Sequence, residues 1–248
     1  MPITAAIVQA RIGSRRLPAK VLEKIEERTM LAHVIERLQQ ATKLDTIILA
    51  IPDEPRSAPL ESEAASLGIR VVRGPEHDVL QRYLVAARAF DVDPIVRVTA
   101  DCPLIDPFLL DQVLAFYLSR REDGIDLVSN TYPRRWPRGL DVEVVSRDAL
   151  ERIGSEEEDP ALREHVTLAI YRRRGFRVEG YVGNRDDLDA SAHRWTVDTL
   201  EDLEFVRAIH AGSPNRRAPL EWRKTLAWIE DNPHLKRINE CIAQKEIP

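Results

Sequence analysis

Cysteine is scarce in this sequence, and long apolar segments are missing from it. Cys102 and Cys241 are the only cysteines among 248 residues, and they lie far apart without C-x-x-C spacing. Neither a zinc site nor a disulfide framework is therefore expected. No stretch approaches the apolar length of a membrane span, and the first residues lack the basic region and cleavage site of a secretory signal. We expect a cytoplasmic protein with no membrane partner.

An excess of positive charge is also lacking. The formal net charge is −5, whereas a protein that binds nucleic acid through its overall electrostatics is usually basic. The proportions of hydrophobic residues (44%) and charged residues (31%) are those of an ordinary globular protein. Local clusters of basic residues therefore indicate the binding partner better than the net charge does. We expect an anionic small molecule as the partner and no nucleic acid.

The common phosphate-binding motifs are missing as well. The sequence has neither G-x-x-x-x-G-K-[ST] nor G-x-G-x-x-G, so a P-loop site and a dinucleotide site lose their main support. The apolar run at residues 3–9 is followed instead by the basic stretch A-R-I-G-S-R-R-L-P-A-K-V-L at residues 10–22. Its bases are Arg11, Arg15, Arg16 and Lys20, and all of them precede the first acid of the chain.

This basic stretch has the chemistry of an anion site. Guanidinium groups match phosphate oxygens two at a time, Ser14 adds a hydroxyl donor, and Gly13 allows backbone N–H groups to come close. Open α/β sheets bind ligands at the carboxyl ends of their strands, which is where the stretch lies. The pattern predicts a triphosphate-binding loop. A surface loop with solvated charges is the alternative.

Strand-like and helix-like patterns alternate through the first half of the chain, which predicts an α/β fold with a mostly parallel sheet. The expected strands are residues 3–8, 46–51, 70–72, 95–98 and 126–129. The expected helices are residues 30–41, 60–67, 79–90 and 107–118. Asp106 is expected to be the N-cap of the last of these helices.

The second half has a less regular pattern. We expect a Pro- and Arg-rich loop that leads into a strand at 140–145, a helix at 159–173, a strand at 177–182 and a tail of two short amphipathic helices. Apolar side chains of the tail suit either core packing or a dimer contact. We expect one domain over residues 1–248, with an insertion at about 131–146 and the helical tail at about 219–248.

Two aspartates at predicted strand ends are candidate Mg²⁺ ligands. Asp101 follows a buried strand at 96–98, and Asp198 follows a short expected strand at 195–197. Mg²⁺ typically takes one or two protein carboxylates and completes its shell with waters and phosphate oxygens. Asp198 also precedes a helix that begins at Thr199, so capping of that helix is its alternative role.

Six ordered motifs together span nearly the whole chain. They are A-R-I-G-S-R-R-L-P-A-K at 10–20, D-V-L-Q-R at 78–82, V-R-V-T-A-D-C-P-L-I-D-P at 96–107, P-R-G-L-D-V-E-V at 137–144, R-E-H-V-T at 163–167 and R-W-T-V-D-T-L-E-D-L at 194–203. This set resembles the cytidylyltransferases of the spore coat polysaccharide biosynthesis protein F type. The wider group contains acylneuraminate and 3-deoxy-manno-octulosonate cytidylyltransferases.

The resemblance implies a Rossmann-like three-layer sandwich of the nucleotide-diphospho-sugar transferase type, and it implies roles for residues at the matching positions. Those implied to bind the nucleotide are Arg11, Gly13, Ser14, Arg16, Lys20, Arg82, Thr99 and Asp101. Those implied to act in catalysis are Arg11, Arg16, Lys20 and Asp101, and those implied to hold Mg²⁺ are Asp101 and Asp198. The region matching the sugar pocket carries Arg138, Asp141, Glu143, Glu164 and His165.

The activity implied is transfer of CMP from CTP to an acceptor, which we expect to be an anionic sugar, with release of pyrophosphate. The residues around the sugar pocket differ from those usual in the wider group, so the sugar is left open. His165 is either a base or a structural residue. A glycosyltransferase is the nearest alternative, although the D-x-D spacing at residues 91–93 falls between a helix and a strand. A non-catalytic nucleotide-binding protein is another alternative, and a homodimer is common in the wider group.

Overall fold

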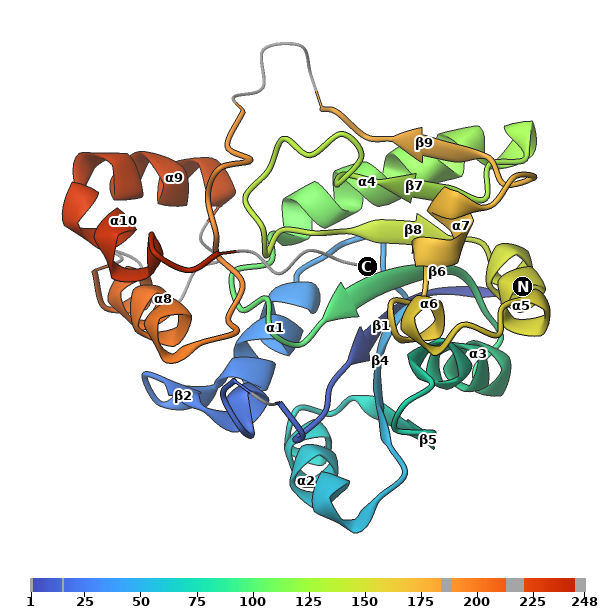
Figure 1. The fold of residues 1–248 in the computed structure, drawn as a ribbon, viewed down its shortest axis with the longest axis horizontal. Helices are drawn as coiled ribbons and strands as arrows, with labels where there is room; N and C mark the ends of the chain where they lie inside the picture. The colour runs from blue at the N-terminus through green and yellow to red at the C-terminus, as the bar shows by residue number, and fades with distance from the viewer. Residues whose placement is uncertain (1, 15, 184–188, 213–220, 244–248) are drawn as a thin grey trace.

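A computed structural model describes residues 2–14, 16–183, 189–212 and 221–243 (Figure 1). Within these residues a seven-stranded sheet has the order β5-β4-β1-β6-β8-β7-β9. Its strands are β1 (Ile3–Gln9), β4 (Thr46–Pro52), β5 (Arg70–Gly74), β6 (Val92–Thr99), β7 (Leu127–Ser129), β8 (Glu143–Val145) and β9 (Val178–Gly180). A separate hairpin consists of β2 (Lys24–Ile25) and β3 (Arg28–Thr29).

The sheet is mostly parallel, as predicted. Strands β1, β4, β5 and β6 pair in parallel, and so do β7 and β9. Strand β8 runs antiparallel to both of its neighbours, β6 and β7. The central strands are nearly continuous apolar runs because helices cover both faces of the sheet.

Helices form a layer on each face of the sheet. One face packs against α1 (Met30–Leu38), α2 (Ala58–Ser66) and α4 (Pro107–Arg120), and the other against α3 (Val79–Ala89) and α5 (Arg147–Glu156). Two hydrophobic clusters, one on each face, result from this arrangement, which confirms the three-layer α/β prediction. Asp106 caps α4 as expected, because its Oδ1 accepts from the backbone N–H groups of Phe108 and Leu109 at 2.8 and 3.0 Å.

Several elements of the second half differ from the sequence-based prediction. The single helix expected at 159–173 is instead two short helices, α6 (Pro160–Glu164) and α7 (Leu168–Arg172). Val166, which lies between them, has a φ of 56°, a left-handed conformation that no α-helix can continue through. Helix α5 was not expected, although Ser146 caps it and Ala149, Leu150 and Ile153 form its buried face.

The predictions of strands at 140–145 and 195–197 are also corrected. Only the last three residues of the segment 140–145 form a strand, β8, and this strand lies inside the central sheet rather than at its mouth. No strand forms at 195–197; an isolated bridge joins Arg138 to Arg194 instead. Gly139 makes this close approach possible, because a Cβ there would lie 2.7 Å from the Thr196 nitrogen.

The C-terminal part of the chain forms α8 (Leu200–Gly212), α9 (Trp222–Asp231) and α10 (Pro233–Asn239), which lie together at one side of the molecule (Figure 1). Residues 219–220 and 244–248, the beginning and end of the expected tail, lie outside the described residues. Trp222 is only 4% exposed and belongs to the same hydrophobic cluster as the sheet, so it packs in the core. None of the helices described here has both the length and the apolar character needed to cross a membrane.

Candidate functional site

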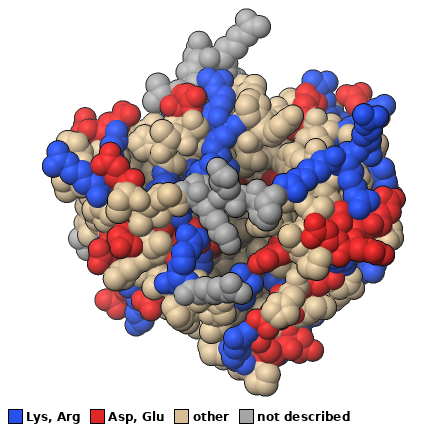
Figure 2. Space-filling model, in the orientation of Figure 1, with Lys and Arg blue, Asp and Glu red and all other residues tan. Residues whose placement is uncertain are grey.

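A cavity of about 760 Å³ opens at the carboxyl ends of β1 and β6. All eight residues predicted to bind the nucleotide line it, together with Glu164 and Asp198. The cavity wall also includes residues that the sequence did not single out, namely Gln9, Ala10, Val21, Arg56, Glu76, His77, Val79 and Ala100. Acidic and basic side chains are interspersed on the face shown in Figure 2.

The loop after β1 turns Lys20 inward. The backbone N–H of Ala19 donates to the Ile12 carbonyl at 3.0 Å, which closes the loop on itself. Ala19 then has a φ of 54° and leads into a short 3-10 helix, Lys20–Leu22. At Gly13 the missing side chain leaves room for Arg56, whose Nη2 lies 3.3 Å from where a Cβ would be. Gly13 therefore allows the Arg56 side chain to pack closely against the loop.

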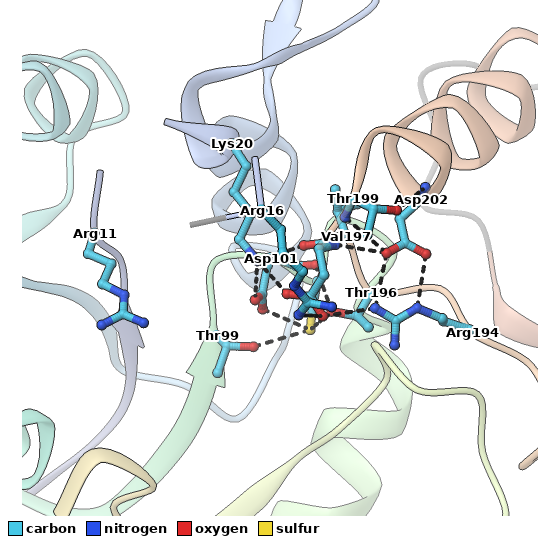
Figure 3. A network of polar contacts seen from close by, with 12 residues as sticks. Arg11, Arg16, Lys20, Thr99, Asp101, Arg194, Thr196, Val197, Thr199 and Asp202 are labelled. Atoms are coloured by element: carbon cyan, nitrogen blue, oxygen red, sulfur yellow. Dashed lines mark hydrogen bonds and ion pairs between the residues drawn. The ribbon is translucent and has the colours of Figure 1, made fainter. Parts of the chain in front are cut away.

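Lys20 is bound by three oxygen atoms that come from widely separated parts of the chain (Figure 3). Its Nζ donates to Asp101 Oδ2 at 2.8 Å, to Asp198 Oδ1 at 2.9 Å and to the Val197 carbonyl at 2.7 Å. An ammonium group has three donors, and these contacts use all of them. In this state Lys20 has no donor left for a phosphate, so a bound nucleotide would have to take Lys20 from one of these partners.

Lys20 and the two aspartates keep one another charged. Burial alone would lower the pKa of Lys20, but the charges and hydrogen bonds of Asp101 and Asp198 outweigh burial and raise it. Burial alone would raise the pKa of Asp101, and Lys20 reverses this and holds it below its usual value. The same balance lowers the pKa of Asp198 to about 2. At neutral pH these three groups are therefore one ammonium and two carboxylates.

Arg11 and Arg16, the described arginines of the loop, also have carboxylate partners. Arg16 Nη2 lies 3.0 Å from Asp198 Oδ2, and Arg11 Nη2 lies 3.3 Å from Glu164 Oε1. Figure 3 shows Arg11 apart from the cluster around Lys20. Both guanidinium groups are more than 40% exposed, so these ion pairs are weak and a phosphate group can replace the carboxylates.

Asp198 does not cap the helix that follows it. Thr199 caps it, because its Oγ1 accepts from the backbone N–H of Asp202 at 3.3 Å, and Asp202 Oδ2 accepts in return from the backbone N–H groups of Thr199 and Asp198 at 3.2 and 2.9 Å. Arg194 donates to Asp198 Oδ2 at 2.8 Å and also binds both oxygens of Asp202. The sequence analysis missed Arg194 and Asp202. Their spacing of four residues on either side of Asp198 was the signal that could have found them.

The oxygen atoms around Lys20 Nζ fit a cation site. Two carboxylates and a backbone carbonyl already converge on one positive charge at 2.7–2.9 Å. Within the part of the chain that the structure describes, no group of three or more His, Cys, Asp or Glu side chains forms a metal site. A pair of aspartates completed by waters and phosphate oxygens is, however, a typical way for proteins to hold Mg²⁺.

Arg82 and Thr99 also line the cavity, and the buried Nε of Arg82 has no hydrogen-bond partner. Arg82 is 1% exposed, and its Nη1 donates to the carbonyls of Pro75 and Glu76 at 2.6 and 2.7 Å. Thr99 Oγ1 lies 3.2 Å from the Sγ of Cys102, a buried thiol next to Asp101. Burial and the charge of Asp101 raise the pKa of Cys102 well above its usual value, so this thiol is neutral.

Of the five residues implied to bind the acceptor, only Glu164 lines the cavity. Glu143 is buried on β8, where it pairs with Arg97 and accepts from Thr167 Oγ1 and Tyr171 Oη at 2.9 and 2.6 Å. Its carboxylate is therefore part of a buried network, which corrects the expectation of a side chain open to an acceptor.

The other three implied acceptor residues lie outside the cavity wall. Asp141 forms a two-bond ion pair with Arg134 at 2.6 and 2.8 Å. His165 follows the last residue of α6, at its C-cap, rather than standing on a helix face. Arg138 is flanked by Arg134 and Arg194, and burial together with these positive charges lowers its pKa.

The mostly parallel sheet, with a basic loop after its first strand and an aspartate pair at the carboxyl edge, defines a protein of the nucleotidyltransferase class. The family model described as cytidylyltransferase matches residues 5–221. The chain belongs to the cytidylyltransferase family, as the motifs predicted.

Individual proteins agree with this assignment. The chain is 31% identical over 217 residues to the spore coat polysaccharide biosynthesis protein SpsF of Bacillus subtilis, covering 85% of this chain and 87% of SpsF. A cytidylyltransferase structure from Leptospira borgpetersenii has a TM-score of 0.90 at 29% identity and covers 99% of this chain and 100% of its own. A CMP:2-keto-3-deoxy-manno-octonic acid synthetase complexed with CTP has a TM-score of 0.65 at 20% identity, covering 84% of this chain and 98% of that one, which shows a shared fold.

Proposed function

We propose that this protein transfers CMP from CTP to a hydroxyl or phosphate oxygen of an anionic, sugar-like acceptor and releases pyrophosphate. The observation that carries the proposal is the convergence of Lys20, Asp101 and Asp198 inside a cavity that Arg11 and Arg16 also line. These residues supply cationic donors for a triphosphate and two carboxylates for a divalent cation. The synthetase that shares this fold is complexed with CTP, which supports CTP as the nucleotide.

The proposed reaction is an in-line attack of the acceptor oxygen on the α-phosphorus, with pyrophosphate as the leaving group. No covalent intermediate with the protein is needed, so catalysis consists of positioning and charge neutralisation. Arg11, Arg16 and the hydroxyl of Ser14 bind the departing phosphates, and Lys20 moves from the aspartates to a phosphate oxygen. Loss of one such preorganised donor typically raises the barrier by about 2.7–4 kcal/mol.

Asp101 and Asp198 are the residues that would hold Mg²⁺. When bound there, Mg²⁺ would neutralise phosphate charge and lower the pKa of an acceptor hydroxyl. Arg194 keeps Asp198 Oδ2 oriented through its 2.8 Å bond, and Lys20 keeps both carboxylates ionised.

An anionic acceptor suits the arginines beside the aspartate pair. Arg138 has no ion-pair partner among the described residues, and its neighbours Arg134 and Arg194 are also positive. The segment of Arg138 runs alongside the segment that carries Asp198, since the N–H of Arg138 donates to the His193 carbonyl at 2.9 Å. A carboxylate or phosphate on the acceptor would relieve the repulsion among these guanidinium groups.

The D-x-D spacing at residues 91–93 gives no support to a glycosyltransferase. Asp93 pairs with Arg121, and Asp91 pairs with Arg147 at 2.6 Å. Both aspartates lie at the start of β6, whereas the cavity is at the end of this strand. The two aspartates therefore form ion pairs at the opposite edge of the sheet from the cavity.

The test is thermal stabilisation of the purified protein by CTP, UTP, GTP and ATP, with and without Mg²⁺, followed by pyrophosphate release with sugar acids and sugar phosphates. A ligand at a hundredfold excess over its Kd stabilises the native state by about 2.7 kcal/mol. We expect stabilisation by CTP that depends on Mg²⁺. We also expect Asp101→Asn to reduce pyrophosphate release at least 100-fold while the protein stays folded.

Asp148→Asn on the exposed side of α5 is the matched control, because its side chain is 80% exposed. It should leave both measurements unchanged. Normal turnover by folded Asp101→Asn would remove Asp101 from the mechanism, and a lack of response to every nucleotide would contradict the proposal as a whole.

A further inference from the structure

The far side of Asp198 is supported by the C-terminal helix α10. This helix, Pro233–Asn239, lies beyond residues 5–221, the part of the chain that matches the family model. It packs on α8, which carries Asp202. Its last residue, Asn239, is only 6% exposed and its side chain points into the polar network behind Asp198.

Asp202 is the centre of this network. Its side chain is fully buried, and both carboxylate oxygens are used. Oδ1 accepts from Arg194 Nε at 2.9 Å and from Asn239 Nδ2 at 3.0 Å. Oδ2 accepts from Arg194 Nη2 at 3.0 Å and from the backbone N–H groups of Asp198 and Thr199. Every polar atom of this carboxylate therefore has its partners, which is what a buried charge requires.

Asn239 also binds the main chain of the residue that pairs with Asp198. Its Nδ2 donates to the Arg194 carbonyl at 3.1 Å, in addition to the bond to Asp202. The Arg194 guanidinium donates in turn to Asp198 Oδ2. One amide group from α10 thus touches both members of the Arg194–Asp202 pair, and that pair holds the backbone and the side chain of Asp198.

We propose that Asn239 is a positioning residue for Asp198, acting through Asp202 and Arg194, so that the C-terminal helix sets the geometry of the cation site. This inference rests on the proposed function, in which Asp198 holds the divalent cation. The Asn239 amide fixes the position of Arg194. Arg194 binds Asp198 Oδ2, and this bond orients the other oxygen, Oδ1, toward Lys20. Residues that orient a metal ligand without touching the metal typically change its affinity about 10–100-fold when they are removed.

Removal of the Asn239 amide should weaken the hold on Arg194 and Asp202 while the residues that line the cavity stay in place. In Asn239→Ala, Asp202 Oδ1 keeps only the Arg194 donor, and the Arg194 carbonyl loses its contact with α10. We expect the Kd for Mn²⁺ to rise about 10-fold, because Asn239 acts through two intervening residues and the effect should be at the low end of the usual range. The KM for the metal should rise with it, while the KM for CTP at saturating metal changes little.

The experiment is a titration of the full chain with Mn²⁺, followed by the electron paramagnetic resonance signal of the free ion, with and without CTP. Asn239→Leu provides a second variant, of similar size but without the amide. Asn232→Ala is the matched control, because Asn232 Nδ2 donates to the Trp228 carbonyl at 2.8 Å in the same tail and does not contact the network. Melting temperatures of all variants are measured alongside.

The expected result is weaker Mn²⁺ binding by both Asn239 variants and unchanged binding by Asn232→Ala. If both Asn239 variants bind Mn²⁺ like the wild type while Asp198→Asn does not, the positioning role is wrong and the metal site stands. If the wild type binds no Mn²⁺ with or without CTP, the metal site of the proposed function fails as well.

Discussion

At the residue scale, the state of the site depends on what the Lys20 ammonium binds. In the structure it donates all three of its hydrogen bonds to oxygen atoms of Asp101, Asp198 and Val197, which in the proposed function would otherwise surround a divalent cation. In the proposed function, ammonium and metal would therefore compete for the same carboxylates until a phosphate gives the ammonium another partner. Metal and nucleotide should consequently favour each other's binding.

This competition gives a prediction for Lys20→Ala. Without nucleotide the variant should bind Mn²⁺ more tightly than the wild type, because no internal cation occupies the two carboxylates. Pyrophosphate release should nevertheless fall about 100-fold or more, because the ammonium is lost from the departing phosphates. Mn²⁺ titration and a turnover assay measure the two effects. Lys24→Ala, at an exposed position on β2, is the control. Equal or weaker Mn²⁺ binding by Lys20→Ala would show that there is no competition.

At the scale of elements, two histidines lie at the contact between α1 and α8. The rings of His33 and His210 have their centroids 4.4 Å apart. Burial, the neighbouring His33 and the charge of Arg37 lower the pKa of His210 to about 3. His33 is also shifted down, chiefly because it is buried. The packing of these helices therefore requires His210 to be neutral.

The consequence is a loss of stability on mild acidification. The unfolded chain binds a proton at His210 below about pH 6.5, whereas the folded protein does so only near pH 3. The stabilisation is therefore complete above about pH 6.5 and decreases as the pH falls, with a slope that approaches about 1.4 kcal/mol per pH unit. Urea unfolding between pH 7 and pH 5 measures it.

His210→Gln should flatten this dependence, and His234→Gln on the exposed side of α10 should not. An unchanged slope in His210→Gln would show that His210 is not the group that takes up the proton.

At the scale of the whole molecule, the C-terminal helices and the sheet share one hydrophobic cluster. Trp136, Trp195 and Trp222 belong to this cluster, and Trp228 packs against it. The aromatic residues of the tail therefore lie against the same core as β1 and β6. We propose that the chain behaves as a single cooperative unit, with α8, α9 and α10 unfolding together with the sheet.

This proposal predicts coincident unfolding transitions. Tryptophan fluorescence reports on the shared cluster, whereas far-UV circular dichroism reports on helices of both layers. Urea midpoints from the two signals should agree. A fluorescence transition at lower urea than the dichroism transition would show instead that the tail unfolds independently.

Much of the fold, and the meeting of the proposed nucleotide residues at one cavity, could be predicted from the sequence, because both depend on local patterns. Alternating apolar runs and helical stripes predicted β1, β4, β6 and the helices between them. Parallel strands bring their carboxyl ends to one edge, so a basic stretch after one strand and Asp101 after another had to meet. For this reason all eight predicted nucleotide residues line the cavity.

The surroundings of the proposed acceptor residues could not be predicted in the same way, because they depend on contacts between distant segments. Glu143 follows the motif pattern, yet the antiparallel position of β8 next to β6 places it against Arg97 in the core. The break at Val166 removed the continuous helix on which His165 was expected. A local pattern does not report which face of a short segment becomes buried, since the neighbouring strands decide it.

The sequence by itself determined the α/β class, the basic loop, the position of Asp101 after a strand and membership of the cytidylyltransferase family. Only the tertiary structure decided that Lys20 sits between Asp101 and Asp198, and that Arg194, Asp202 and Asn239 hold Asp198 from behind. The physical reason is that a charge is buried only with partners of suitable geometry, and these partners lie up to 178 residues apart along the chain.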